Sequence, residues 1–403
     1  MPVNIVTSQV IPFRIPGPVP REAACLVLRA DTGDEGAGEA APIEGFSPEG
    51  LATSIHALHA VRTRIDAIDE RAPPVEAASR ALAPHAAVLA SAPSARFAVE
   101  TALFDLLARR RGEDVASCLR AGGAEGGAPE PIEASALLRD PADPAFIERV
   151  TAAIARGFRV LKVKLRAVDD QTLDREIEGL RALRRVAPDV ELRLDPNGRW
   201  SIEEARRRLA RLAEVTPSFV EQPVSPEDLA HLGPCAVPWA ADESLGLPGF
   251  PERLSAEAGC AAFVLKPAAL GICRARELAK VARSRGLGVV VTHFFDGPIG
   301  LAAACETALS LGGKLLACGL DPHVGLSSLP KSALPHHGAP AVASARSLLP
   351  RNSGDEGHGD GDGHGDAPGD GPRTGAFPRI HRTGATGLGL PRDVPTLLAP
   401  WMS

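Results

Sequence analysis

The sequence predicts an α/β protein in which a (β/α) barrel of the TIM type follows a smaller α+β domain. From the middle of the chain onward, short apolar runs that end on a charged or polar residue recur roughly every 20–31 residues, the length of one strand-plus-helix unit. Residues 1–125 lack this rhythm. An open doubly wound sheet is the structural alternative. A barrel is favoured because no run is followed by GxGxxG or a P-loop, which would mark a nucleotide site.

Residues 1–125 form the predicted α+β domain. Two strands and then three helices are expected there, at Val3–Ile15, Ala23–Arg29, Leu51–Ile68, Val75–Leu89 and Ser94–Arg111. A Gly/Asp turn is expected at Asp31–Gly38. The charged, Gly/Pro-rich loop 38–49 is a candidate lid, and the Gly/Pro/Ala-rich segment 121–131 predicts a linker.

The barrel domain is predicted over residues 131–325. Its eight strands are expected in the apolar runs Pro131–Leu138, Leu161–Leu165, Leu192–Asp195, Phe219–Pro223, Trp239–Ser244, Phe263–Pro267, Val289–Gly297 and Leu315–His323. The helices between them include Pro144–Arg156, Asp174–Val186, Ile202–Leu212, Arg274–Ser284 and Ile299–Leu311. Barrels of this kind carry their chemistry at the carboxyl ends of the strands. The polar residues of these runs fall at those ends.

Residues 326–403 form a C-terminal segment of mixed composition. Residues 352–375 alternate Asp, Gly and His and are too polar and glycine-rich to bury a core, which predicts a disordered insertion. The last residues recover apolar side chains, so we expect them to pack back on the amino-terminal domain.

The composition excludes several classes of protein. The 403 residues are 44% hydrophobic and 23% charged, and a net charge of −6 gives no reason to expect nucleic acid or an anionic membrane as partner. Seven cysteines occur without a CxxC pair, which is typical of buried thiols in a reducing compartment. Neither a signal peptide nor a membrane-spanning run is evident. We therefore expect a cytoplasmic protein that acts on a small molecule.

Three lysines are the candidate bases. Strand alternation places Lys162 and Lys164 on one face of LKVKL, and the apolar residues that alternate with them face outward. Both lysines are therefore expected to point into the barrel mouth. Two ammonium groups so close repel each other, which lowers the pKa of at least one of them. Lys266, which ends FVLKP four strands further round, is expected to face Lys164 across the mouth.

Three carboxylates are the candidate metal ligands. Asp195, Glu221 and Asp242 end three consecutive strands, and each alone is more often a helix cap than a ligand. Together they would repel one another unless a cation neutralises them. Hard oxygen ligands in that number suit Mg²⁺, with Mn²⁺ possible, and Asn197 and Glu243 are expected beside them. No zinc pattern is present.

A lysine base, an opposed lysine and a divalent metal predict proton abstraction beside a substrate carboxylate. The metal binds the carboxylate, and the lysine removes the proton on the adjacent carbon. The resulting enediolate is stabilised by the surrounding positive charge. β-Elimination or reprotonation on the other face can then follow.

The motifs KVK, DPN, VEQP, ADES and VLKP, in this order and spacing, resemble the enolase superfamily, muconate-lactonizing-enzyme subgroup. The resemblance covers most of the chain except the low-complexity stretch. It implies a (β/α)7β barrel with an amino-terminal capping domain. It also implies that Lys164 is the base, with Lys162 lowering its pKa, that Asp195, Glu221 and Asp242 bind Mg²⁺, and that Lys266 lies on the opposite face of the substrate.

Within the subgroup the chain is most similar to the o-succinylbenzoate synthases of menaquinone biosynthesis, because of Arg193 and of Asp321 in GLDPH. This resemblance implies dehydration of 2-succinyl-6-hydroxy-2,4-cyclohexadiene-1-carboxylate. The turn that begins at Thr292, THFFDGPIG, departs from the serine-rich turn of relatives, so the groups that hold the succinyl arm stay open. Phe294, Phe295 and the helix start at 298–300 are candidates for that role.

Other functions remain possible at this point. Dipeptide epimerases and N-succinylamino acid racemases use the same two-lysine site. Epimerases usually carry an Asp-x-Asp pair on the eighth strand, where only Asp321 is present here. Muconate cycloisomerisation is a further enzymatic alternative. A catalytically silent metal-binding or scaffolding protein is the alternative from another class. The oligomeric state does not follow from the sequence.

Overall fold

The computed structural model describes residues 2–17, 20–62, 65, 67–121, 131–327, 329, 337–338, 379–380, 386–390 and 393–402, and every structural statement below concerns these residues. The predicted linker, except for its two end residues, and the low-complexity segment 352–375 lie outside them. Among the described residues, no helix is both long enough and apolar enough to span a membrane.

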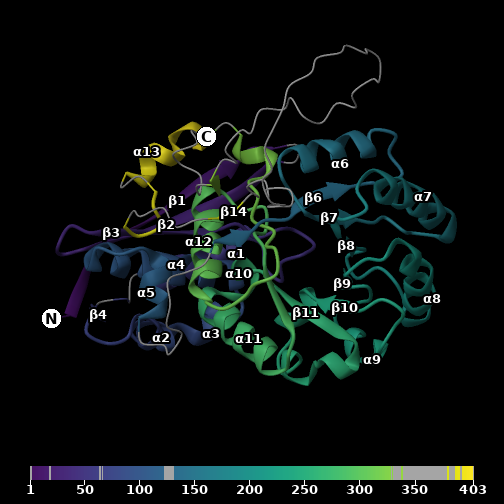
Figure 1. Ribbon diagram of the computed structural model, residues 1–403. Helices are drawn as coiled ribbons and strands as arrows, with labels where there is room; N and C mark the ends of the chain where they lie inside the picture. Colours follow the sequence, from purple (N-terminus) through teal and green to yellow (C-terminus); the bar gives the residue numbers. More distant parts are fainter. Residues whose placement is uncertain are drawn as a thin grey trace, which may run out of the picture.

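The amino-terminal domain is a four-stranded antiparallel sheet covered by helices (Figure 1). The strand order is β3-β2-β1-β4, with bounds β1 Pro2–Ile15, β2 Arg21–Ala30, β3 Glu35–Ala40 and β4 Ala67–Asp69. The helices are α1 Leu51–Arg62, α2 Pro74–Leu82, α3 Ala86–Ala90, α4 Pro93–Arg111 and α5 Val115–Arg120. The two predicted strands and the helix at Ser94–Arg111 are present.

The third strand, β3, was missed because its glycines were interpreted as a turn. The turn occupies only residues 31–34, and β3 follows at once. Gly36 and Gly38 face α4 so closely that an added Cβ would lie 2.1 Å from the Ala102 carbonyl oxygen and 1.8 Å from that of Ala98. These glycines therefore allow the strand to approach the helix.

Two predicted helices are shorter than expected. The helix predicted over Leu51–Ile68 ends at Arg62, because residues 67–69 pair with β1 as the edge strand β4. The helix predicted over Val75–Leu89 is interrupted by a 3-10 turn at Ala83–His85, which contains Pro84. Proline lacks the amide hydrogen that a continuous α-helix needs.

The predicted barrel fold is confirmed by a curved sheet of seven parallel strands in sequential order. Their bounds are β6 Ala136–Arg139, β7 Val160–Lys164, β8 Glu191–Asp195, β9 Phe219–Glu221, β10 Trp239–Ala241, β11 Cys260–Leu265 and β12 Gly288–Val291. The eighth position is a short bridging segment. Cys318 pairs with Ala134 just before β6, and Gly319 pairs with Thr292 just after β12, so the two edges of the sheet are joined into a barrel.

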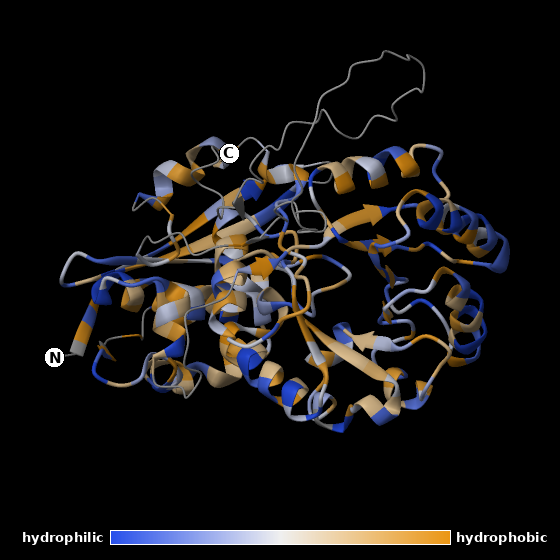
Figure 2. Cartoon of the chain, viewed as in Figure 1, coloured by the Kyte–Doolittle hydropathy of each residue, from blue (hydrophilic) through white to orange (hydrophobic). Residues whose placement is uncertain are grey.

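Helices surround the barrel. They are α6 Phe146–Ala155, α7 Asp170–Val186, α8 Ile202–Leu212, α9 Leu229–Leu232, α10 Pro267–Leu270, α11 Ile272–Ser284 and α12 Pro298–Ser310. Figure 2 shows that α7 and α8 carry many hydrophilic residues, whereas β6 and β7 are largely hydrophobic. Helix α8 begins with a capping box between Ser201 and Glu204, so the chain turns into a helix directly after the DPNG exit of β8.

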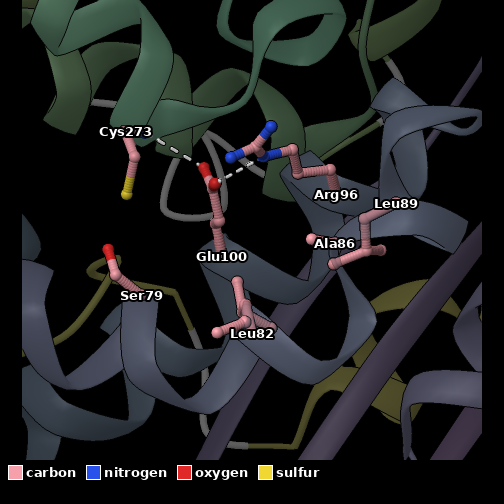
Figure 3. A pocket seen from close by; sticks show the side chains of 8 residues that line it. Ser79, Leu82, Ala86, Leu89, Arg96, Glu100 and Cys273 are labelled. Carbon is pink, nitrogen blue, oxygen red and sulfur yellow. Dashed lines mark hydrogen bonds and ion pairs between the residues drawn. The ribbon is translucent and has the colours of Figure 1, made fainter.

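The two domains are joined by a buried acidic side chain of α4 (Figure 3). Glu100 is 1% exposed and accepts hydrogen bonds from Arg96 Nε at 3.0 Å and from the Cys273 amide at 3.0 Å. A small cavity lies beside it, between α2 to α4 and α11. Because the carboxylate is satisfied by these partners, we interpret Glu100 as a docking contact between the domains.

The described C-terminal residues pack on the amino-terminal domain. Trp401 stacks on Phe13 with ring centroids 6.4 Å apart, and the Leu388 amide donates to Asp105 at 2.8 Å. The short helix α13, Val394–Leu398, lies nearby (Figure 1). Two short strands, β13 His337–Gly338 and β14 Arg379–Ile380, form a small sheet with β5 Ile132–Glu133 at the start of the barrel.

Candidate active site

The two lysines of β7 point into the barrel mouth. In the parallel register, Lys162 lies opposite Arg193 and Lys164 opposite Asp195. The residue between the lysines, Val163, is fully buried in the core beneath the surrounding helices. Because successive side chains of a strand alternate between its faces, both amines lie on the inner face.

The three predicted carboxylates come from neighbouring strands. Asp195 ends β8, Glu221 ends β9 and Asp242 follows β10, and all three are buried. The Lys162 Nζ atom lies 2.9 Å from Asp195 Oδ2 and also pairs with Glu221 Oε2. Lys164 Nζ is 3.4 Å from Asp195 Oδ2. Since one ammonium nitrogen bridges two of the carboxylates, their oxygens can share a cation.

Lys266 flanks the carboxylates from the other side. It directly follows β11 and precedes α10. Its Nζ atom lies 2.7 Å from Asp242 Oδ2 and 3.2 Å from Glu243 Oε1, and 5.2 Å from the centre of the Phe294 ring. The site therefore has amines on both sides of a row of three acidic side chains.

The lysines on the two sides differ in their affinity for a proton. Burial lowers the pKa of Lys164, and the ammonium charges of Lys162 and Lys266 lower it further against the attraction of Asp195. Burial also disfavours the charged form of Lys266, but the Asp242 and Glu243 carboxylates outweigh it and raise the pKa of Lys266. Of these two lysines, Lys164 therefore loses its proton more readily.

The acidic side chains fit a divalent cation. Apart from their ion pairs with lysine, Asp195 Oδ2 and Asp242 Oδ2 are buried and accept no hydrogen bond. Burial and the Glu243 carboxylate raise the pKa of Asp242 to about 7. In the described part of the chain, no three acidic, histidine or cysteine side chains are arranged closely enough to hold a metal ion as they stand. Lysine amines lie against Asp195 and Asp242. Buried carboxylate oxygens whose partners are lysine amines alone are ligands that suit Mg²⁺ or Mn²⁺.

Asn197 and Gln222, which follow the candidate ligands Asp195 and Glu221 in the sequence, hold the site in place. Asn197 Oδ1 accepts a hydrogen bond from Lys164 Nζ at 2.6 Å. Gln222, which was missed at the sequence level, accepts from the amides of Asp242 at 3.1 Å and Ser244 at 3.3 Å. Asn197 and Gln222 both have positive φ, 54° and 38°, a conformation that costs about 1–3 kcal/mol and is found at functional sites. The sequence feature that could have identified Gln222 as part of the site is its position directly after Glu221.

Arg193 does not join this group of side chains. It is 1% exposed, and its Nε donates to Glu191 Oε1 at 2.8 Å while its Nη1 donates to the Ala317 carbonyl at 2.7 Å. Glu191 is the first residue of β8, so the guanidinium is turned toward the amino end of the barrel. The structure thus places Arg193 inside the barrel, below the carboxylates.

Asp321 and Thr292 are also engaged elsewhere. The Asp321 carboxylate pairs with Arg156 Nη2 at 2.8 and 3.0 Å. Thr292 Oγ1 donates to the Gly319 carbonyl at 3.0 Å and thereby helps to join the last strand to the barrel.

The turn after β12 is held by His293 and Arg21, which were not identified from the sequence. Phe295 has φ 54°, and its amide donates to His293 Nδ1 at 2.9 Å. Arg21 of β2 donates to the carbonyls of Phe294, at 3.3 Å, and Phe295. Because His293 Nδ1 accepts a hydrogen bond and Nε2 lies 3.1 Å from the Asp321 carbonyl, the ring is the neutral Nε2–H tautomer. Burial lowers the pKa of His293 to about 3, so this histidine positions the turn and does not exchange protons near neutral pH.

Comparison with known proteins decides the family. The model of the family described as "Enolase C-terminal domain-like" matches residues 145–354, just over half of the chain. The chain belongs to the enolase superfamily. The matched residues of this superfamily member include all three lysines and all three carboxylates described above.

Curated relatives of this enolase-superfamily protein include synthases and epimerases. The o-succinylbenzoate synthases of Desulfotalea psychrophila and Mycobacterium ulcerans are each 33% identical, over 230 and 195 residues, which cover 54% and 47% of this chain and 59% and 56% of the relative. A hydrophobic dipeptide epimerase of Roseobacter litoralis is 28% identical over 249 residues, covering 60% of this chain and 69% of the relative. The chain thus spans less than two thirds of each synthase.

Solved structures agree with the fold. A mandelate racemase/muconate lactonizing enzyme from Roseiflexus sp. matches with a TM-score of 0.69 at 27% identity, covering 80% of this chain and 90% of that one. A dipeptide epimerase from Enterococcus faecalis matches with a TM-score of 0.67 at 20% identity over the same shares, which supports the fold alone. Membership of the enolase superfamily and the enzymes among its relatives indicate that this protein is an enzyme.

Proposed function

We propose that this protein is an o-succinylbenzoate synthase, a Mg²⁺-dependent lyase of menaquinone biosynthesis that dehydrates 2-succinyl-6-hydroxy-2,4-cyclohexadiene-1-carboxylate to 2-succinylbenzoate. The arrangement of Lys164 and Lys266 on the two sides of the buried carboxylates carries the proposal. It is supported by the synthases among the curated relatives, which are more similar in sequence than the epimerases.

Lys164 is the proposed base. Its amine is accessible at the barrel mouth and is oriented by Asn197 Oδ1 at 2.6 Å. It would remove the proton on the carbon next to the substrate carboxylate, and the electron pair of that C–H bond would move toward the carboxylate. The ammonium of Lys266, held by Asp242 and Glu243, would stabilise the negative charge that develops there.

The same lysine can complete the elimination. The proton that Lys164 has taken is available to the departing hydroxyl on the same face of the ring, so the C–O bond breaks as water leaves and the ring becomes aromatic. A divalent cation held by Asp195, Glu221 and Asp242 would supply positive charge at the substrate carboxylate and thereby make the carbon-bound proton more acidic.

Dipeptide epimerisation is the second candidate, and two observations bear on it. Epimerases are among the curated relatives, and lysines on two sides suit proton removal and return on opposite faces. Against this, the Asp321 carboxylate is paired with Arg156, which makes it less suited to bind the ammonium of a dipeptide. We therefore rank the dehydration first.

Three further expectations belong to the same proposal. We propose residues 1–125 as the capping domain. Residues 38–40 of the predicted loop 38–49 belong to β3, so we propose only residues 41–49 as the lid, which is consistent with the 53% exposed Phe46 side chain on that loop. We propose that the enzyme acts in the cytoplasm, which is consistent with seven free thiols. We propose a small-molecule carboxylate as substrate and neither nucleic acid nor a membrane as partner.

The direct test is turnover of the cyclohexadiene carboxylate by the purified full chain with Mg²⁺, followed by the absorbance of the aromatic product. We expect Lys164→Ala and Asp195→Asn to lower the rate roughly 100- to 10,000-fold, the usual contribution of a general base or of charge stabilisation. Lys280→Ala, which removes an exposed lysine of α11, is the matched control and should keep the wild-type rate.

Incubation with an Ala-Glu dipeptide in D₂O, read by mass spectrometry, tests the second candidate. Deuterium at the α-carbon of the dipeptide without any dehydration of the cyclohexadiene would overturn the proposed reaction. Full activity of either the Lys164 or the Asp195 variant would contradict the assigned roles.

A further inference from the structure

We propose that Arg139 binds a second carboxylate of the substrate and thereby selects dianionic substrates. The proposal rests on the proposed function, because it assumes that the reacting carbon lies beside Lys164. It names a specificity residue on the first strand of the barrel, where neither the motifs nor the family resemblance assigned one.

The strand register places Arg139 in the barrel mouth. It is the last residue of β6 and lies opposite Lys164 of β7, which in turn lies opposite Asp195 of β8. The three strands are neighbours in the sheet (Figure 1). Residues that are paired in this way project to the same face, so Arg139 extends the inner row that contains the base and a metal-ligand candidate.

The mouth is open at this position. Leu137 lies two residues before Arg139 on the same face, opposite Lys162, and is 39% exposed although it is a large apolar side chain inside a barrel. Among the described residues, no side chain fully covers this part of the inner wall. A substrate with an apolar ring beside Leu137 and a carboxylate beside Arg139 would occupy this space.

The charge of Arg139 is not neutralised by the protein. Among the residues that the structure describes, no carboxylate pairs with its guanidinium, and the two nearest acids in the sequence are already engaged. Asp140 pairs with Arg166 at 3.4 Å, and Asp143 pairs with Arg149 at 2.8 Å. An uncompensated guanidinium at the edge of an active site suits a carboxylate, which it can bind through two parallel hydrogen bonds.

The Arg139 guanidinium also packs on an aromatic ring, that of Phe295. Its central carbon lies 5.4 Å from the centre of the Phe295 ring, a cation–π distance. Phe295 holds its positive φ because His293 accepts from its amide and Arg21 donates to its carbonyl. The strained turn after β12 thus presents an aromatic face on which Arg139 rests.

The spacing suits a short acidic arm. Neighbouring strands lie about 4.8 Å apart, so the Arg139 and Lys164 side chains start about that far apart. A substrate whose reacting carbon is next to Lys164 would therefore bring a carboxylate about five bonds away, the spacing of the succinyl carboxylate in the proposed substrate, within reach of the long Arg139 side chain. Arg139 is exposed in the structure, so its guanidinium is hydrated. A substrate with an apolar group in that place would remove this hydration without supplying a partner, which is costly.

Binding, rather than turnover, is the test, so that its failure can be distinguished from failure of the proposed reaction. The probes are 2-succinylbenzoate and 2-butanoylbenzoate, which share a carbon skeleton except that the second lacks the distal carboxylate. Their dissociation constants are measured by calorimetry with Mg²⁺ for the wild type, Arg139→Gln and Arg139→Lys. Arg181→Gln, which removes one exposed charge from the outer face of α7, is the matched control.

We expect the wild type and Arg181→Gln to bind 2-succinylbenzoate roughly 10- to 100-fold more tightly than 2-butanoylbenzoate, the usual effect of one charged hydrogen-bonded contact. Arg139→Gln should lose most of this preference, and Arg139→Lys should retain part of it. The proposal is overturned if the wild type binds both probes equally, if it binds neither, or if Arg139→Gln keeps the full preference. Absence of dehydration by a wild type that shows the preference would refute the proposed reaction alone.

Discussion

Replacing Glu39 with Gln should change how the stability of the protein depends on pH. Glu39 is the next-to-last residue of β3 and is 1% exposed. It accepts hydrogen bonds from the amides of Gly297 and Gly300 at the start of α12, the latter at 3.1 Å. Glu39 thus fixes the amino-terminal domain to the barrel beside the turn that supports Arg139.

The magnitude follows from the pKa of this side chain. Burial, with the Asp296 carboxylate nearby, raises the pKa of Glu39 from 4.5 to about 7. Between pH about 4.5 and pH about 7, Glu39 holds a proton in the folded protein that it has released in the unfolded chain. The stabilisation is therefore fully present below pH about 4.5 and is lost as the pH rises through about 7. The full shift corresponds to about 3 kcal/mol, of which about 2 kcal/mol falls between pH 5.5 and pH 8.

The assay is urea unfolding of the metal-free protein at pH 5.5 and pH 8, followed by tryptophan fluorescence. The quantity compared is the free energy of unfolding of Glu39→Gln minus that of the wild type. We expect this difference to be about 2 kcal/mol larger at pH 8 than at pH 5.5, so the variant is relatively more stable at pH 8. Glu35→Gln, on the same strand but paired with Arg29 at the surface, is the control for the change in net charge. If the difference between Glu39→Gln and the wild type were the same at both pH values, the reasoning would be refuted.

Two further predictions concern the ends of β8 to β10. Gln222→Ala should lower the free energy of unfolding by about 2–3 kcal/mol, because it leaves the buried amides of Asp242 and Ser244 without their acceptor. Urea unfolding measures this loss, and a loss below about 0.5 kcal/mol would contradict the role of Gln222. Saturating Mg²⁺ should raise the melting temperature of the wild type by an amount equivalent to about 2.7 kcal/mol at 100 times its dissociation constant. The same addition should raise the melting temperature of Asp195→Asn far less, and an equal rise in both proteins would argue against metal binding by Asp195.

The periodicity of the chain was enough to predict the barrel. Short apolar runs at strand-plus-helix spacing recur because each parallel strand must be buried on both faces and connected by a helix. The polar residues at the ends of these runs could likewise be assigned to one rim, since parallel strands place their carboxyl ends together. For that reason Lys162, Lys164, Asp195, Glu221, Asp242 and Lys266 were all named from the sequence, and the structure brings them together.

Local patterns were less informative where packing overrides composition. Gly36 and Gly38 indicate a turn by composition, yet they form a strand because α4 lies too close for a side chain. Residues 67–69 continue an apolar pattern that suggested a helix, yet pairing with β1 makes them an edge strand. In both places a partner that is distant in sequence supplies the energy that decides the conformation.

The repeating strand-helix architecture and the set of acidic and basic groups at the barrel mouth depend on spacing along the chain, so both could be predicted before the fold was known. Which of the polar groups remain available depends on how the chain folds. It turned Arg193 into the barrel interior, paired Asp321 with Arg156, and left Arg139 without a carboxylate on the ring of Phe295. The direction of a long side chain and the identity of its partner depend on residues brought close by folding, and no local pattern encodes them.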